Sequence, residues 1–147
     1  MMRQASNPAF ADEVRRSFAK QAIMGLIGGE LTRVEPGVVE IALRYREDLT
    51  QQDGFVHAGI VTTIADSACG YAAYSLMPPE SEVLAVEFKV NLLRPAKGES
   101  FVARAEVIKS GRTLTVVRAD VFATTGDEQQ LVATMQGTMM RLPRRRG

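Results

Sequence analysis

The chain has 147 residues, a formal net charge of +1, one cysteine and one histidine, and these values exclude several classes of protein. The length suits a single domain whose core is large enough to fold without disulfides or structural metal. Eighteen Lys and Arg against 17 Asp and Glu leave no basic excess for binding nucleic acid. Cys69 alone excludes an internal disulfide and a cysteine-based zinc site, and His57 alone excludes chemistry that needs two histidines. The N-terminus has no signal-peptide pattern, so we expect a cytoplasmic protein. As separate expectations, the protein needs no metal and no cofactor.

Residues 8–27 are predicted to form one helix that packs against the rest of the domain. Asn7 suits the capping position, Pro8 suits the first helical position, and Gly28-Gly29 follow the expected end. Apolar side chains recur at every fourth position and form a stripe along the helix: Phe10, Val14, Phe18 and Ala22.

Six segments are predicted to be strands: 30–35, 37–46, 83–93, 99–109, 113–124 and 130–142. In residues 39–45 apolar and polar side chains alternate, which is typical of a half-buried strand. Short turns such as Ser110-Gly111 join the later strands, so the sheet is expected to be largely antiparallel. The basic tail, residues 143–147, is predicted to be a frayed and solvated end.

Residues 55–77 are predicted to form a buried helix that begins near Ala58 and ends before Pro78. A membrane span is rejected because His57 and Asp66 lie inside the segment, which is rich in small residues rather than in Leu and Ile. The small side chains make the helix slim, so a sheet can approach it closely. One central helix against a long antiparallel sheet is an α+β arrangement.

Asp66 is the sharpest candidate for chemistry, because it lies in the middle of this helix beside apolar and small residues. A carboxylate in such surroundings is costly to bury unless it is paired or functional. The non-functional alternative is that Asp66 points into solvent on a polar edge of the helix with Thr62 and Thr63. For His57, at the start of the helix, the non-functional alternative is a packing or capping role.

The first amides of the helix, at Ala58 and Gly59, have no acceptor within the helix and lie at the positive end of its dipole. They can therefore hold an oxyanion, and Gly59 lets a ligand approach the backbone closely. Asp66, two turns below, is then expected to face a carbonyl whose oxygen is held at this terminus. That combination suits the transfer of an acyl group to water.

Three motifs in this order resemble the hotdog-fold acyl-CoA thioesterases. The first is Gly54–Gly59 (GFVHAG) followed by the helical Asp66, which is similar to the H-G-G pattern of the phenylacetate-degradation (PaaI-like) type in the 4-hydroxybenzoyl-CoA thioesterase superfamily. The second is Asn91–Gly98 (NLLRPAKG), and the third is the basic turn Lys109–Leu114 (KSGRTL). The resemblance covers residues 25–142. It implies a single domain over 1–147 with the hotdog fold, a curved antiparallel sheet wrapped around one long central helix.

The resemblance also implies roles for individual residues. Asp66 would be the nucleophile or the general base that activates water, and the amide of Ala58 would polarise the thioester carbonyl. His57 would position the loop and the thioester, with Gly59 beside it. Gln51 would orient substrate or water. The turn residues would contact the nucleotide and phosphates of coenzyme A: Ser110, Gly111, Arg112 and Thr113.

Two positions depart from the family pattern. Ala58 replaces the first glycine of H-G-G, so the amide remains but the methyl group narrows the site. Ala85 stands where some relatives carry a serine or threonine, which removes a polar partner from the site.

The predicted function is hydrolysis of an acyl-CoA thioester to a carboxylic acid and free coenzyme A. The alternative is a non-catalytic hotdog module that binds an acyl thioester, and a weaker alternative is a hotdog dehydratase. Asp66 separates a hydrolase from a binding module, because the hydrolase requires it and the binding module tolerates its loss. The identity of the acyl group, aromatic or fatty, stays open. The strand at 83–93 has an alternating pattern, and an exposed edge of this length must be covered or used. The hotdog resemblance implies that it pairs with the same edge of a second copy. It also implies a homodimer or homotetramer in which Asp66 of one chain faces the region of Gln51 and His57 of another.

Overall fold

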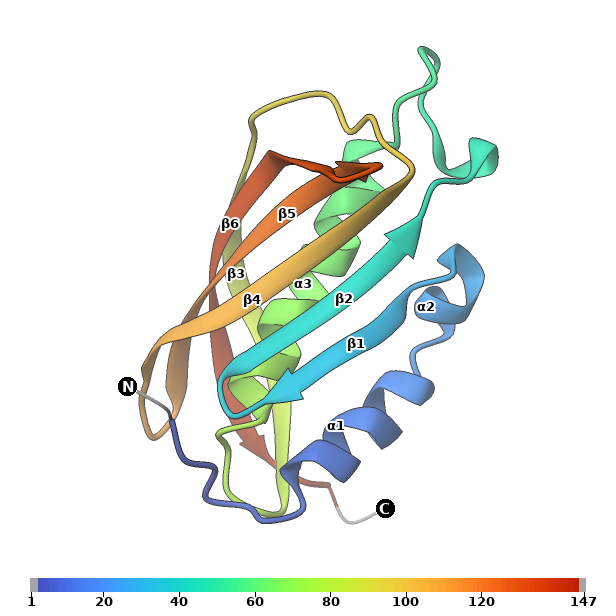
Figure 1. Cartoon of the computed structure of the whole chain (residues 1–147). Helices are drawn as coiled ribbons and strands as arrows, with labels where there is room; N and C mark the ends of the chain where they lie inside the picture. Colours follow the sequence, from blue (N-terminus) through green and yellow to red (C-terminus); the bar gives the residue numbers. More distant parts are fainter. Residues whose placement is uncertain (1–2, 146–147) are drawn as a thin grey trace.

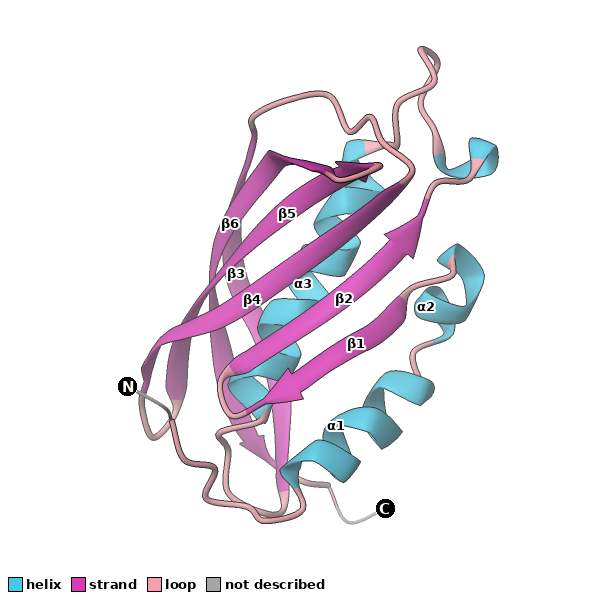
Figure 2. Cartoon of the chain, viewed as in Figure 1, coloured by secondary structure: helices cyan, strands magenta, loops and turns pink. Residues whose placement is uncertain are grey.

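Helix α3 (Ala58–Tyr74) lies in the curve of a six-stranded sheet in the computed structural model, which describes residues 3–145 (Figure 1). The strands are β1 (Glu30–Glu35), β2 (Val38–Arg44), β3 (Ser81–Leu92), β4 (Ser100–Ser110), β5 (Leu114–Thr125) and β6 (Glu128–Pro143). Their order is β1-β2-β4-β5-β6-β3, and every pair of neighbours is antiparallel. Figure 2 shows the sheet bending around the helix. This is the predicted α+β hotdog fold.

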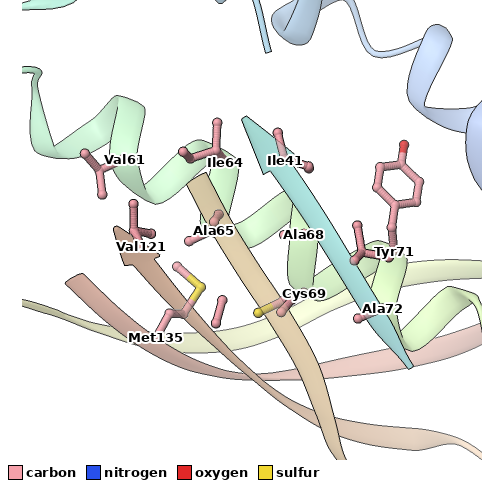
Figure 3. Packing of buried hydrophobic residues seen from close by; sticks show 14 of the residues in the cluster. Ile41, Val61, Ile64, Ala65, Ala68, Cys69, Tyr71, Ala72, Val121 and Met135 are labelled. Atoms are coloured by element: carbon pink, nitrogen blue, oxygen red, sulfur yellow. The ribbon is translucent and has the colours of Figure 1, made fainter. Parts of the chain in front are cut away.

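The core lies between α3 and the concave face of the sheet (Figure 3). On the helix side, Ala65, Ala68 and Ala72 are fully buried, and their small side chains bring the helix axis close to the strands. On the sheet side, larger side chains such as Ile41 and Met135 fill the space opposite them. Because native interiors are close-packed, this pairing of small with large residues fixes where α3 lies, and α3 in turn places Asp66.

The single helix predicted over 8–27 is wrong, because the chain forms two helices, α1 (Phe10–Ala19) and α2 (Ala22–Ile27). Between them Gln21 adopts an extended backbone, with φ −75° and ψ 101°. The side chain of Gln21 bonds two side chains of α3, and these distant partners favour the break. The predicted end is correct: Gly28 has φ 81°, and its N–H donates to the carbonyl of Met24.

Strand β3 is an edge of the sheet, since β6 is its sole neighbour among the described strands. Four of its large apolar side chains are exposed: Leu84 54%, Val86 54%, Phe88 44% and Leu92 56%. The ladder to β6 also has an irregularity between Ala85 and Glu87. A long edge with an exposed apolar row is a surface that proteins cover or use.

The C-terminal tail is held through Arg144 rather than frayed from residue 143 as predicted. The N–H of Arg144 donates to the carbonyl of Glu80 at 2.9 Å, and its guanidinium donates to the Tyr74 hydroxyl at 3.2 Å. The guanidinium also lies 3.6 Å from the carboxylate of Glu13. Residues 146–147 of the predicted tail lie outside the described residues.

None of the helices within residues 3–145 combines the length and the hydropathy that a membrane-spanning helix requires.

Candidate active site

The start of α3 is fixed by hydrogen bonds to two neighbouring loops. The N–H of His57 donates to the carbonyl of Leu49 at 2.9 Å, and the N–H of Val56 donates to the carbonyl of Ala96 at 3.0 Å. The imidazole Nδ1 of His57 accepts the N–H of Gly59 at 2.8 Å, so His57 caps the helix. Because Nδ1 is the acceptor, the neutral ring carries its proton on Nε2. A Cβ at Gly59 would lie 3.0 Å from Nδ1, which explains the glycine.

The backbone N–H of Ala58 is the free donor of this helix end. Gly59 donates to His57, while Ile60 and Val61 donate to the carbonyl of residue 57. In the described part of the chain Ala58 N–H has no acceptor, and it lies where the helix dipole is positive. It can therefore stabilise an oxyanion, whereas the amide of Gly59 is already engaged.

Gln51 lines the same cavity as Ala58. The cavity has a volume of about 410 Å³, and most of its lining is apolar: Phe55, Val56, Val61, Leu92, Leu93, Pro95, Ala96 and Val132. The Oε1 of Gln51 accepts the N–H groups of Asp53 and Phe55, at 2.6 and 3.2 Å. The side chain is thereby held with its amide nitrogen left to donate, which suits a carbonyl oxygen or a water molecule.

Arg94 lines this cavity, although no role was predicted for it from the sequence. It belongs to the loop after β3 and lines the cavity beside Pro95 and Ala96. Arg94 belongs to the motif Asn91–Gly98, whose resemblance to a family turn was recognised. That resemblance does not indicate that the turn lies beside Ala58. The loop lies against the start of α3 through the bond from Val56 to Ala96.

Asp66 lies farther along α3, at a second cavity of about 200 Å³. Its Oδ1 is buried and has no hydrogen-bond partner within residues 3–145. Burial raises the pKa of the Asp66 carboxyl above its usual value, because the charged form is desolvated. Asp66 as a whole is half-buried, as are Thr62 and Thr63, so the polar-edge alternative holds in part: one carboxylate oxygen of Asp66 is turned inward. Thr62 and Thr63 donate back to the carbonyls of residues 58 and 59, each at 2.8 Å.

The two cavities are separate, and one chain does not bring Asp66 to the amide of Ala58. Eight residues of α-helix span about 12 Å along the axis. A carbonyl held at Ala58 is therefore out of reach of Asp66 in the same chain. The expectation that both groups face one carbonyl from one helix is wrong within a single chain, and the helix rise is the reason.

The turn predicted to contact coenzyme A lies at the other end of the molecule. Residues 110–113 form the exposed turn between β4 and β5, where Gly111 N–H donates to the carbonyl of Leu114 at 2.8 Å. The end of β4 lies beside the C-terminal end of α3, because Val107 donates to Gly37 and Gly37 donates to Ser75. Figure 1 shows this turn far from the first turn of α3. One chain therefore leaves the turn separated from Ala58.

Two further residues near Asp66, Ala85 and Cys69, offer no group that could take part in hydrolysis. Ala85, on β3, lines the Asp66 cavity and contributes no polar atom to it. Cys69 is fully buried, and desolvation raises the pKa of its thiol to about 12, so it stays protonated. In the described residues, no three His, Cys, Asp or Glu side chains gather as metal ligands would.

A family model of the thioesterase superfamily matches residues 53–129, which include the start of α3, Asp66 and the β4–β5 turn. The chain belongs to the thioesterase superfamily. The solved structure of a thioesterase family protein from Silicibacter pomeroyi is 54% identical and has a TM-score of 0.90, and the match covers 91% of this chain and 98% of that one.

Two curated relatives of this thioesterase extend the comparison. A Saccharolobus solfataricus protein, provisionally named an esterase, is 33% identical over 126 residues, which is 86% of this chain and 81% of that protein. The 1,4-dihydroxy-2-naphthoyl-CoA hydrolase of Listeria monocytogenes is 30% identical over 96 residues, 63% of this chain and 78% of that enzyme. These matches confirm the predicted family and the predicted class of enzyme, a thioester hydrolase.

Proposed function

We propose that this thioesterase hydrolyses acyl-CoA thioesters to a carboxylic acid and free coenzyme A, and that two copies of the chain build each site. One observation carries the proposal: the free amide of Ala58 and the unpartnered oxygen of Asp66 are the two groups that hydrolysis needs, and they lie in separate cavities of one chain. The Listeria relative, named as the hydrolase of a CoA thioester, supports coenzyme A as the thiol.

The edge strand β3 supports the two-copy arrangement. It contributes Ala85 to the Asp66 cavity and Leu92 to the Ala58 cavity. In an antiparallel pairing about a two-fold axis, the early part of one edge strand faces the late part of the other. Pairing of two β3 edges would therefore place the Asp66 cavity of one copy beside the Ala58 cavity of the other, and cover the exposed apolar row.

In this arrangement the substrate carbonyl oxygen accepts the N–H of Ala58, with the Gln51 amide nitrogen as a second donor. Asp66 of the other copy takes a proton from a water molecule as the water oxygen bonds to the carbonyl carbon. The negative charge that develops on the carbonyl oxygen is stabilised by the two donors. The carbon–sulfur bond then breaks, and the proton passes from Asp66 to the sulfur of coenzyme A. The products are a carboxylic acid and a thiol, so the atoms of one water molecule are accounted for.

The turn of residues 110–113 is proposed to contact the nucleotide and phosphates of coenzyme A. Arg112 is exposed there, and a guanidinium matches the geometry of a phosphate. Since this turn lies far from Ala58 in its own chain, the same pairing of copies is needed to bring it toward the thioester.

The proposal is tested by measuring thiol release from a panel of aliphatic and aromatic acyl-CoA substrates. Asp66→Asn should lower kcat by about 10²-fold or more, which is the usual scale for a positioned base or nucleophile. Asp127→Asn, in the exposed turn between β5 and β6, is the matched control and should behave like the parent. Near-normal turnover by Asp66→Ala would contradict the mechanism. Binding of acyl-CoA by the parent without turnover would instead indicate a binding module.

A further inference from the structure

The cavity at Asp66 has one polar wall and one apolar wall. The sheet side is apolar, with Val83 and Ala85 from β3 and Met139 from β6. The polar side comes from the N-terminal helices and α3, through Ser17, Gln21, Ser67 and Tyr71. The groups that can position a polar molecule against Asp66 within one chain therefore come from α3 itself and from α1 and the break that follows it.

Gln21 is the residue that the helix break places at this wall. Its Oε1 accepts the hydroxyl of Ser67 at 3.2 Å, and its Nε2 donates to the hydroxyl of Tyr71 at 2.9 Å. Tyr71 is 3% exposed, and its hydroxyl also lies 3.1 Å from the Oγ of Ser17. The amide of Gln21 is thus held on both sides by α3. A carboxamide nitrogen carries two hydrogens, so one N–H of Gln21 remains for a molecule in the cavity.

The other free group in the cavity is Asp66. Its carboxylate lines the cavity together with Gln21, while its Oδ1 is closed off and has no partner within residues 3–145. A carboxylate without a donor is costly, so a molecule in the cavity that donates to it is favoured. A cavity of about 200 Å³ has ample room for water, and a buried water molecule needs two to four polar partners. A water molecule that donates to Asp66 and accepts from Gln21 meets this requirement.

We infer that Gln21 is a positioning residue of the hydrolytic reaction, whose amide, held between Ser67 and Tyr71, fixes the attacking water against Asp66. The inference rests on the proposed function and adds a polar group that the apolar sheet wall does not supply. A water molecule that donates to Asp66 and accepts from Gln21 has the direction of its free lone pair set by both residues. Loss of the Gln21 amide leaves Asp66 able to accept the proton, but the attacking water is no longer oriented. Substrate contacts at Ala58 and at the turn of residues 110–113 are unaffected.

Steady-state kinetics of Gln21→Ala test the inference. We expect kcat to fall by about 10-fold to 100-fold, the range for one hydrogen bond to a reacting group, with KM nearly unchanged. Gln21→Asn keeps an amide and should recover part of kcat. Gln129→Ala, at an exposed position near the start of β6, is the matched control and should keep the parent kcat.

A competing nucleophile separates water positioning from a structural role. With hydroxylamine present, the acyl group partitions between water and hydroxylamine, and Gln21→Ala should raise the hydroxamate share because only the water is held by the amide. Tyr71→Phe should produce a smaller effect of the same kind, and the double variant should lose no more than Gln21→Ala, since Tyr71 acts through Gln21.

The outcomes distinguish this inference from the proposed function. No thiol release by the parent chain would overturn the proposed function. Thiol release that depends on Asp66, together with unchanged kcat and unchanged partitioning in Gln21→Ala, would overturn the inference alone. A lower kcat with parent-like partitioning and a lowered melting temperature would show a structural role and would also overturn it.

Discussion

The two cavities along α3 differ in volume, lining and source of their polar groups. The Ala58 cavity, of about 410 Å³, is mostly apolar, and its donors are a backbone amide and the side chain of Gln51. The Asp66 cavity, of about 200 Å³, holds a carboxylate and a network of side-chain hydrogen bonds from the N-terminal helices. Under the proposed mechanism, the first cavity stabilises negative charge and the second accepts a proton. Neither cavity contains the groups for both tasks, so this mechanism needs the two cavities to meet.

The largest expected effect comes from preventing two copies from pairing through their β3 edges, which keeps the Ala58 and Asp66 cavities apart. Phe88→Lys places a charge in the exposed apolar row, so both association and turnover should be lost, with a drop in kcat of about 10²-fold or more, as for loss of the base itself. Ile108→Lys, at a side chain of β4 that is 50% exposed, is the control and should leave both intact. Light scattering and thiol release, measured on the same samples, check the prediction. A fully active monomer of 16.1 kDa would contradict the two-copy site.

A smaller effect is expected at the turn between β4 and β5. Arg112→Ala should raise KM for acyl-CoA by about tenfold while kcat changes little, because a remote phosphate contact stabilises ground state and transition state alike. Arg15→Ala, at an exposed arginine of α1, is the control. A drop confined to kcat would mean that the nucleotide binds elsewhere. In that case Arg94, at the Ala58 cavity, becomes the next arginine to test.

The smallest effect is on stability, and its sign follows from the burial of Asp66. Its pKa in the folded chain is raised above 3.8, so the folded state binds more protons than the unfolded state between the two pKa values. Stability contributed by the protonated form is lost as pH rises through the raised pKa. Asp66→Asn should therefore melt at a higher temperature than the parent at pH 7, and this difference should shrink below pH 3.8.

The pH dependence of activity gives a second readout of the same carboxyl. The acid limb of kcat/KM should have its midpoint above 3.8, because Asp66 must be ionised to accept a proton. Tyr71 and Cys69 lie nearby, and burial raises the pKa of both, so neither titrates in this range. For the stability prediction, a melting temperature of Asp66→Asn equal to that of the parent at every pH would contradict the argument from desolvation of Asp66.

The sequence predicted the parts of the fold that follow from local pattern. The small-residue run at 55–77 led to α3, and the alternating segments led to strands whose ends lie within two residues of those found. The break at Gln21 was missed because its cause is 46 and 50 residues away, at Ser67 and Tyr71. The apolar stripe through Phe10 and Phe18 continues across the break and conceals it.

The candidate site was predicted in its residues but not in its geometry. Gln51 and Ala58 do share a cavity, and Asp66 is half-buried, with one carboxylate oxygen fully buried. Sequence proximity made Asp66 and Ala58 look like neighbours, although the rise of a helix separates them. The position of the 110–113 turn depends on the direction of β4 along the sheet, which no local pattern reports.

Mixing two inactive variants tests the shared site most directly. If Asp66 of one chain works with Gln51 of another, Asp66→Asn and Gln51→Ala chains, unfolded and refolded together, will form mixed dimers with one intact site and one doubly defective site. With random pairing, the mixture should recover about one quarter of the parent activity, while each variant refolded alone stays low. Activity of the mixture equal to the average of the two separate variants, with mixed dimers demonstrated by differential tagging, would contradict the account.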